Sequence, residues 1–125
     1  MRTIIAGSRS IDDYALIQKA VLDSGFEITE VVSGGARGVD LLGEQWAKEN
    51  GIPCTRFDPD WDLNGKRAGK DRNELMGNYA EALIAVWDGE SRGTEHMIKY
   101  ARKKGLKVYV FTYSSQKQDE VRSLF

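Results

Sequence analysis

The sequence has one cysteine, one histidine and two prolines among its 125 residues. One cysteine excludes an intramolecular disulfide and any zinc site that needs several cysteines. One histidine leaves little from which to build a histidine-rich metal site or a Ser-His-Asp triad. We therefore expect no bound metal and no resident cofactor. Cys54 falls in a predicted strand, where we expect a small buried side chain.

The chain also lacks long apolar runs and a marked excess of charge of one sign. No run approaches the roughly 20 apolar residues needed to span a bilayer, and no apolar signal segment follows Met1. These absences predict a cytoplasmic protein without a membrane partner. The net charge is −1, from 18 lysines and arginines against 19 aspartates and glutamates. Broad attraction to nucleic acid is therefore not indicated, although a local basic patch would be compatible with it.

What the sequence does contain is a regular alternation of strand and helix patterns. Short apolar runs predict strands at residues 3–6, 30–33, 54–57, 82–87 and 107–111. The stretches between most of them have helical periodicity, which predicts an α/β protein with a parallel sheet between two layers of helices. The runs at 3–6 and 82–87 are unbroken, so we expect them to be adjacent central strands. One domain over residues 1–113 follows, and then a polar tail at 114–125 with a short helix expected at 119–124.

Residues 58–70 show no regular pattern and are predicted to form a long loop, which in a compact domain is usually functional or mobile. Trp61 in this loop has two interpretations, a lid over the core or an aromatic side chain that stacks on a ligand base. Asp71 and Glu74 then have the spacing of a capping box. They predict the start of a short helix whose apolar side carries Leu75, Met76, Tyr79 and Ala80.

The most distinctive motif is the turn after the second predicted strand, with Ser33, Gly34, Gly35, Arg37, Gly38 and Asp40. Its glycines allow backbone conformations that a Cβ would forbid, so the chain can approach a ligand closely. A strand, a glycine turn and a helix N-terminus together favour an anion, most often phosphate. Arg37 would add a cation, and Asp40 an acceptor in the first helical turn. The alternative is a tight turn whose glycines only serve packing.

Two further polar turns follow predicted strands, one with Gly7, Ser8 and Arg9 and one with Asp88, Gly89, Gly93 and Thr94. Carboxyl ends of parallel strands meet at one edge of a sheet, where ligands bind in such folds. We therefore predict one pocket shared by Arg9, residues 33–38, Arg72, Gly93 and Thr94. The motifs match neither a GxGxxG fingerprint after the first strand nor a Walker A loop, which disfavours ordinary dehydrogenases and P-loop NTPases.

These motifs resemble those of the SLOG superfamily, the Rossmann-like group that includes DprA, the LOG phosphoribohydrolases and small stand-alone proteins of bacteria and phages. The matching segments are residues 7–9, 33–40, 68–73 with Met76, and 88–94. The resemblance implies a five-stranded parallel sheet and a dimer or higher oligomer such as a tetramer. It also implies a nucleotide or nucleotide-derived ligand over the glycine turns, either a nucleoside phosphate or an ADP-ribose- or NAD-like molecule.

Carried over by position, the resemblance implies that Gly34, Gly35 and Gly38 hold phosphate through backbone N–H groups. Arg9 and Arg37 would add charge-assisted hydrogen bonds to the same phosphate.

The remaining motif residues would complete the site. Arg72 and Asn73 would close it from their helix, and Gly93 and Thr94 would form a second phosphate cradle. Asp88 would accept a hydrogen bond from a ribose hydroxyl.

The chain departs from the LOG enzymes at one position. Those enzymes have a catalytic glutamate three residues after the motif threonine, and here that residue is Met97. We therefore expect a nucleotide-binding module that acts as a sensor or a sequestering protein. One alternative is a hydrolase of N-glycosidic bonds in nucleotides, with Glu95 and Asp88 as the catalytic candidates. The second is single-stranded DNA binding as in DprA.

Overall fold

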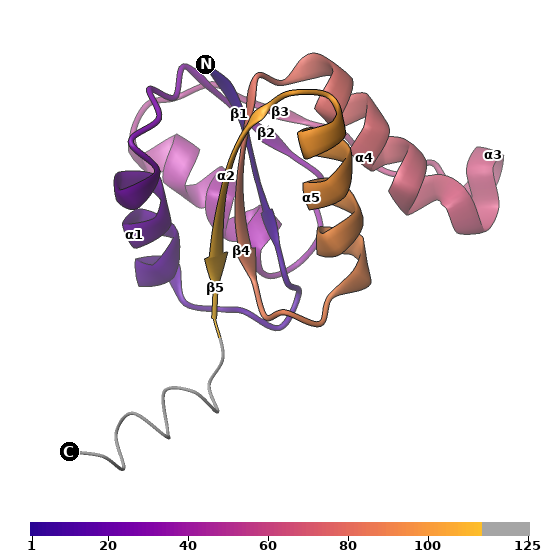
Figure 1. Ribbon diagram of the computed structural model, residues 1–125, viewed down its shortest axis with the longest axis horizontal. Helices are drawn as coiled ribbons and strands as arrows, with labels where there is room; N and C mark the ends of the chain where they lie inside the picture. The colour runs from indigo at the N-terminus through magenta and orange to yellow at the C-terminus, as the bar shows by residue number, and fades with distance from the viewer. Residues whose placement is uncertain (114–125) are drawn as a thin grey trace, which may run out of the picture.

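The computed structural model describes residues 1–113, which form one sheet flanked by helices (Figure 1). The strands are β1 (Arg2–Gly7), β2 (Glu30–Ser33), β3 (Cys54–Arg56), β4 (Ala82–Trp87) and β5 (Lys107–Thr112). The helices are α1 (Tyr14–Ser24), α2 (Val39–Glu49), α3 (Trp61–Asn64), α4 (Ala68–Tyr79) and α5 (Arg92–Lys103), with a 3-10 turn, η1 (Gly65–Arg67), before α4. The helix expected at 119–124 lies outside the described residues.

The sheet has the order β3-β2-β1-β4-β5, and every neighbouring pair of strands is parallel. The predictions of a five-stranded parallel sheet and of adjacent central strands at 3–6 and 82–87 are confirmed. From β1 the chain proceeds outward through β2 to β3, and then returns to the other side of β1 for β4 and β5. The strand order therefore reverses between β1 and β4, the point where open α/β sheets leave a crevice at their carboxyl edge.

The two faces of the sheet bury separate halves of the core. Alternate side chains of a strand point to opposite faces of the sheet. Ile5 of β1 and Ile84, the residue paired with it on β4, pack with α1 and α2. Ile4 and its neighbour Leu83 pack with α4 and α5 instead. All four side chains are fully buried, and each such burial contributes about 1.5–3 kcal/mol. The result is the expected three-layer arrangement.

The first helix begins and ends where local chemistry predicts. Asp13 caps α1, its carboxylate accepting a hydrogen bond from the Ala15 N–H at 3.1 Å. Gly25 ends the helix in the left-handed region, with φ of 69°, where glycine avoids the strain that a Cβ would bring.

The prediction of a loop over residues 58–70 is wrong, because α3, η1 and the first residues of α4 occupy most of it. Asp60 starts α3 by accepting a hydrogen bond from the Leu63 N–H at 3.0 Å. Helix α4 begins at Ala68, directly after η1, so Asp71 lies in its first turn and is not its cap. No residue of α3 or η1 is buried, and Figure 1 shows this arm extending from one side of the body.

Three further predictions of burial are wrong. Cys54 is exposed because β3 is a short strand at the edge of the sheet. Leu75 and Tyr79 are also exposed, since Met76 and Ala80 occupy the face of α4 that packs on the body. Within residues 1–113, no helix combines the length and the apolar character that crossing a membrane requires.

Candidate functional site

The three polar turns meet at the carboxyl edge of the sheet, as predicted. They follow β1, β2 and β4, which are neighbours in the order β2-β1-β4. The turns after β1 and β4 also touch each other, because the Ser8 Oγ accepts a hydrogen bond from the Asp88 N–H at 2.9 Å. The turn after β2 contacts the first one, since the Val39 N–H donates to the Ser8 carbonyl.

A cavity of about 230 Å³ opens at the point where the strand order reverses. We call it the switch-point cavity. Its walls come from the end of β1, the start of α5, the residues of α3, η1 and α4 that face the sheet edge, and the turn after β2. Five of its lining residues are arginines or lysines: Arg9, Lys66, Lys70, Arg72 and Arg92.

A second cavity of about 400 Å³ lies beside the glycine turn, and we call it the loop cavity. Gly34, Gly35 and Arg37 form one wall, and Asp58 and Pro59 form another. The two cavities share the lining residues Arg9, Ala36, Trp61 and Arg72. They therefore adjoin each other, and we treat them as two compartments of one candidate site.

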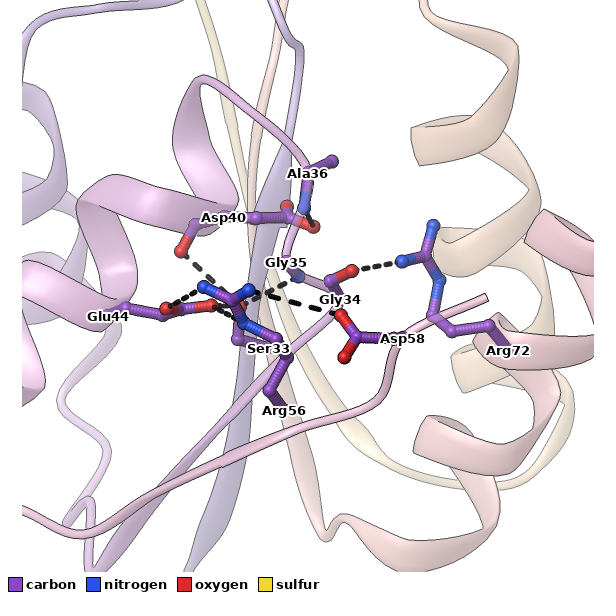
Figure 2. Close-up of polar contacts among 9 residues, drawn as sticks. All are labelled: Ser33, Gly34, Gly35, Ala36, Asp40, Glu44, Arg56, Asp58 and Arg72. Carbon is purple, nitrogen blue, oxygen red and sulfur yellow. Dashed lines mark hydrogen bonds and ion pairs between the residues drawn. The ribbon is translucent and has the colours of Figure 1, made fainter. Parts of the chain in front are cut away.

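The glycine turn is held by acceptors from its own chain. The Ser33 Oγ accepts a hydrogen bond from the Gly35 N–H at 3.1 Å, and the Asp40 carboxyl accepts one from the Ala36 N–H at 3.2 Å (Figure 2). The Gly35 N–H is thus engaged within the turn. Gly38 lines neither cavity, because its Cα faces the backbone of Ser8 and Arg9.

Asp40 is the buried acid of the site, with 5% of its surface exposed. Burial raises its pKa from the ordinary 3.8 to about 6, while the Ala36 N–H and the Arg72 charge oppose that rise. Its carboxyl lies under the turn and also lines the switch-point cavity. Asp40 therefore supports the backbone of the turn from within the first turn of α2.

A polar network behind the turn was missed by the sequence analysis. Glu44 accepts hydrogen bonds from the Ser33 hydroxyl at 2.6 Å and from Arg56 at 2.9 and 2.6 Å (Figure 2). Burial alone would raise the pKa of Glu44, but the hydrogen bonds from Arg56 and Ser33 lower it. The sequence does contain one indication of this network. Glu44 lies four residues after Asp40, so both side chains are on the same face of α2.

Helix α4 connects the glycine turn to α5. Arg72 donates a hydrogen bond to the Gly34 carbonyl, and its Nε donates to the Asn73 side-chain oxygen at 3.1 Å. The Asn73 amide nitrogen donates to the Gly93 carbonyl at 3.2 Å and lies 3.2 Å from the His96 Nδ1. His96, which the sequence analysis did not place in the site, lines the switch-point cavity, and burial lowers its pKa.

The residues around the start of α5 divide into two groups. Gly93 and Thr94 line the switch-point cavity together with Met97. Asp88 and Gly89 line neither cavity, and the Asp88 carboxylate accepts hydrogen bonds from the Glu90 and Ser91 N–H groups at 2.8 Å each.

Neither catalytic candidate faces the site. Asp88 is engaged in its own turn, as described. Glu95 is exposed, pairs with Lys99 at 3.0 Å and lines neither cavity. The helical position that carries glutamate in the LOG enzymes holds the buried Met97 side chain.

Trp61 lies at the border of the two cavities, with 55% of its surface exposed. It belongs to α3, which is away from the two core clusters. The interpretation of Trp61 as a lid over the core is thereby disfavoured. The indole remains available to a bound molecule.

Comparison with known proteins relates this arrangement to one family. A family model described as "YAcAr: YspA, cpYpsA-related SLOG family" matches residues 1–63. The Gene 61 protein of Mycobacterium phage D29 is 35% identical over 120 residues, which cover 88% of this chain and 95% of the phage protein.

A solved structure also has this fold. The X-ray structure of DNA processing protein A (DprA) from Streptococcus pneumoniae matches with a TM-score of 0.73 at 17% identity. The match covers 98% of this chain, which spans 55% of the DprA chain. The resemblance of the sequence motifs to the SLOG superfamily is confirmed, and the chain belongs to the YspA, cpYpsA-related SLOG family.

Proposed function

We propose that the chain binds a nucleotide or nucleotide-derived ligand, with the phosphate groups in the switch-point cavity. The observation that carries this proposal is the charge of the cavity lining. Five cations line it, while Asp40 is the one carboxylate among its described lining residues. The Asp40 carboxyl already accepts the Ala36 N–H and has Arg72 beside it. An anion is therefore the ligand that this compartment favours.

The architecture around the cations supports the same ligand class. Helix α5 has 12 residues and directs its N-terminus at the cavity through Gly93, and a helix dipole favours anions there. The site as a whole is large enough for a nucleotide, since small-molecule pockets typically have about 300–1,000 Å³. The cavities measure about 230 and 400 Å³ and adjoin each other.

Binding without hydrolysis is the form of this function that we favour. General acid–base catalysis needs a group within hydrogen-bond reach of the reacting bond. Glu95 and Asp88 line neither cavity, and a thioether at Met97 cannot transfer a proton. Two titratable groups do line the switch-point cavity, but the Asp40 carboxyl is engaged by the Ala36 N–H and the His96 Nδ1 lies 3.2 Å from the Asn73 amide nitrogen. A sensor or a sequestering protein needs no such group.

Single-stranded DNA binding is the second candidate, because DprA is named for DNA processing and Trp61 is exposed beside several cations. Exposed aromatic and basic side chains together form stacking sites for bases. A homo-oligomer, which the family resemblance implies, would suit either function.

A ligand screen tests the proposal. Thermal-shift and calorimetric titrations would compare nucleoside mono- and diphosphates, ADP-ribose, NAD and short DNA oligonucleotides. We expect at least one nucleotide to raise the unfolding midpoint, because a ligand that binds only the native state stabilises it. A rise with the oligonucleotides alone would favour the DNA candidate and overturn the proposal.

Two arginine variants make the test specific to the site. Arg9 lines both cavities, so Arg9→Ala should weaken nucleotide binding by about tenfold or more, the effect of losing a charged hydrogen bond. Arg102→Ala removes an exposed arginine from the last turn of α5 and should leave the affinity unchanged. Equal affinities for the two variants would contradict the assignment of the site.

A further inference from the structure

The loop cavity differs chemically from the switch-point cavity that it adjoins. Beside the glycine turn it has a carboxylate, Asp58, and an exposed indole, Trp61, both from the segment that follows β3. A carboxylate repels phosphate but accepts hydrogen bonds from neutral hydroxyl groups. The two compartments therefore suit the two halves of a nucleotide.

The Asp58 carboxylate is placed by residues of the motif and its supporting network. Its Oδ1 lies 4.0 Å from the Arg56 Nη1, and Arg56 is itself held by Glu44 (Figure 2). A Cβ built on Gly35 would lie 3.0 Å from the same oxygen, so the carboxylate lies directly against the turn.

This carboxylate is also available to a ligand. The Asp58 side chain is 71% exposed, and among the described residues it accepts no hydrogen bond. Asp88, which the sequence motifs suggested for a ribose hydroxyl, is already engaged by two backbone N–H groups. Of these two aspartates, only Asp58 lines the site.

We infer, on the basis of the proposed function, that the loop cavity holds the ribose-bearing half of the nucleotide and that Asp58 accepts hydrogen bonds from the ribose hydroxyls. The two oxygens of one carboxylate can accept from two adjacent hydroxyls, as the acidic residue of dinucleotide-binding folds does for ribose. The site is then selective for ribonucleotides over deoxyribonucleotides. Trp61, at the border of the cavities, lies within the site for contact with the base.

Calorimetry with matched sugar pairs tests this inference. The probes are the four ribonucleoside 5′-diphosphates and their 2′-deoxy counterparts, and the measured quantity is the ratio of the two dissociation constants for each base. We expect the wild type to bind the ribonucleotide of its preferred base about tenfold more tightly. Asp58→Ala should bring this ratio close to one. A general distortion of the site would leave this ratio unchanged, because it would weaken the binding of the ribonucleotide and of its deoxy counterpart alike.

Asp62→Ala is the matched control, since Asp62 is an exposed carboxylate of α3 that lines neither cavity. Its ratio should equal that of the wild type. Equal binding of ribo- and deoxyribonucleotides by the wild type would overturn this inference alone, as would an unchanged ratio in Asp58→Ala. A change in base preference without a change in sugar preference would assign Asp58 to the base and also overturn it. Absence of binding by every nucleotide would overturn the proposed function as well.

Discussion

Gly35 offers the most direct test of the glycine turn, because a glycine elsewhere in the chain has nearly the same positive φ. Gly35 has φ of 72° and Gly25 has φ of 69°. Alanine at either position incurs about 1–2 kcal/mol of left-handed strain. A Cβ at Gly35 would also lie 2.9 Å from the Arg56 Cδ and 3.0 Å from the Asp58 Oδ1, whereas at Gly25 no heavy atom lies within 4 Å.

Both substitutions should therefore destabilise the fold, Gly35→Ala by at least as much as Gly25→Ala, but they should affect binding differently. The left-handed strain alone should lower the free energy of unfolding of each variant by about 1–2 kcal/mol, and each kcal/mol lowers Tm by about 3–6 °C in a domain of this size. In Gly35→Ala the new methyl group also displaces Asp58, which lines the loop cavity, and Arg56, which pairs with Asp58. We expect its nucleotide affinity to fall by about tenfold or more, the effect of losing one charged hydrogen bond.

Urea unfolding would measure the stability of both variants, and calorimetry would measure their affinity for the nucleotide that binds the wild type most tightly. Gly25→Ala should retain the wild-type dissociation constant, since Gly25 ends α1 and lines neither cavity. Wild-type affinity in Gly35→Ala would refute the placement of the ligand against the turn. Equal losses in both variants would show instead that binding follows overall stability.

Three further outcomes follow from the site. Because burial raises the pKa of Asp40 from 3.8 to about 6, the folded protein holds a proton between these two pH values that the unfolded chain has released. Stability should therefore fall by about 2 kcal/mol from this group as pH rises from 4 to 7, and urea unfolding of Asp40→Asn should lack that contribution. Trp61→Ala should weaken nucleotide binding, measured by calorimetry, by about tenfold through lost stacking. Leu63→Ala should not, because Leu63 is an exposed residue of α3 that lines neither cavity. Chromatography should detect no base release from nucleoside monophosphates, and robust turnover that Glu95→Gln or Asp88→Asn abolishes would contradict this.

The features that the sequence predicted correctly depend on local patterns. The apolar runs at β1 and β4 identified the central strands because a strand covered on both faces needs no polar side chains. The glycine turns indicated the site because parallel strands bring all their carboxyl ends to one edge. Both inferences require only the local pattern of apolar residues and the fact that the strands run in the same direction.

The features that were missed depend on partners distant in the chain. Arg56 reaches Glu44 because β3 pairs with β2 in a register that sets Arg56 opposite Ser33, and no local pattern specifies that register. The exposure of Cys54 follows from the edge position of β3, which the sequence does not reveal. The start of α4 at Ala68 was missed because η1 leads directly into it without a side-chain cap.

The distribution of charge gives a physical reason to prefer a compact anion over a polyanion. The whole chain has a net charge of −1, although five cations line the switch-point cavity. Acidic residues elsewhere must therefore offset that local excess. A nucleic acid presents many phosphates along its length and gains affinity from each one that is neutralised, so its binding needs cations well beyond the cavity. A nucleotide carries its charge on one or two phosphate groups and would experience only the field inside the cavity, where low-dielectric walls strengthen it. This contrast supports the proposed nucleotide over the single-stranded DNA candidate.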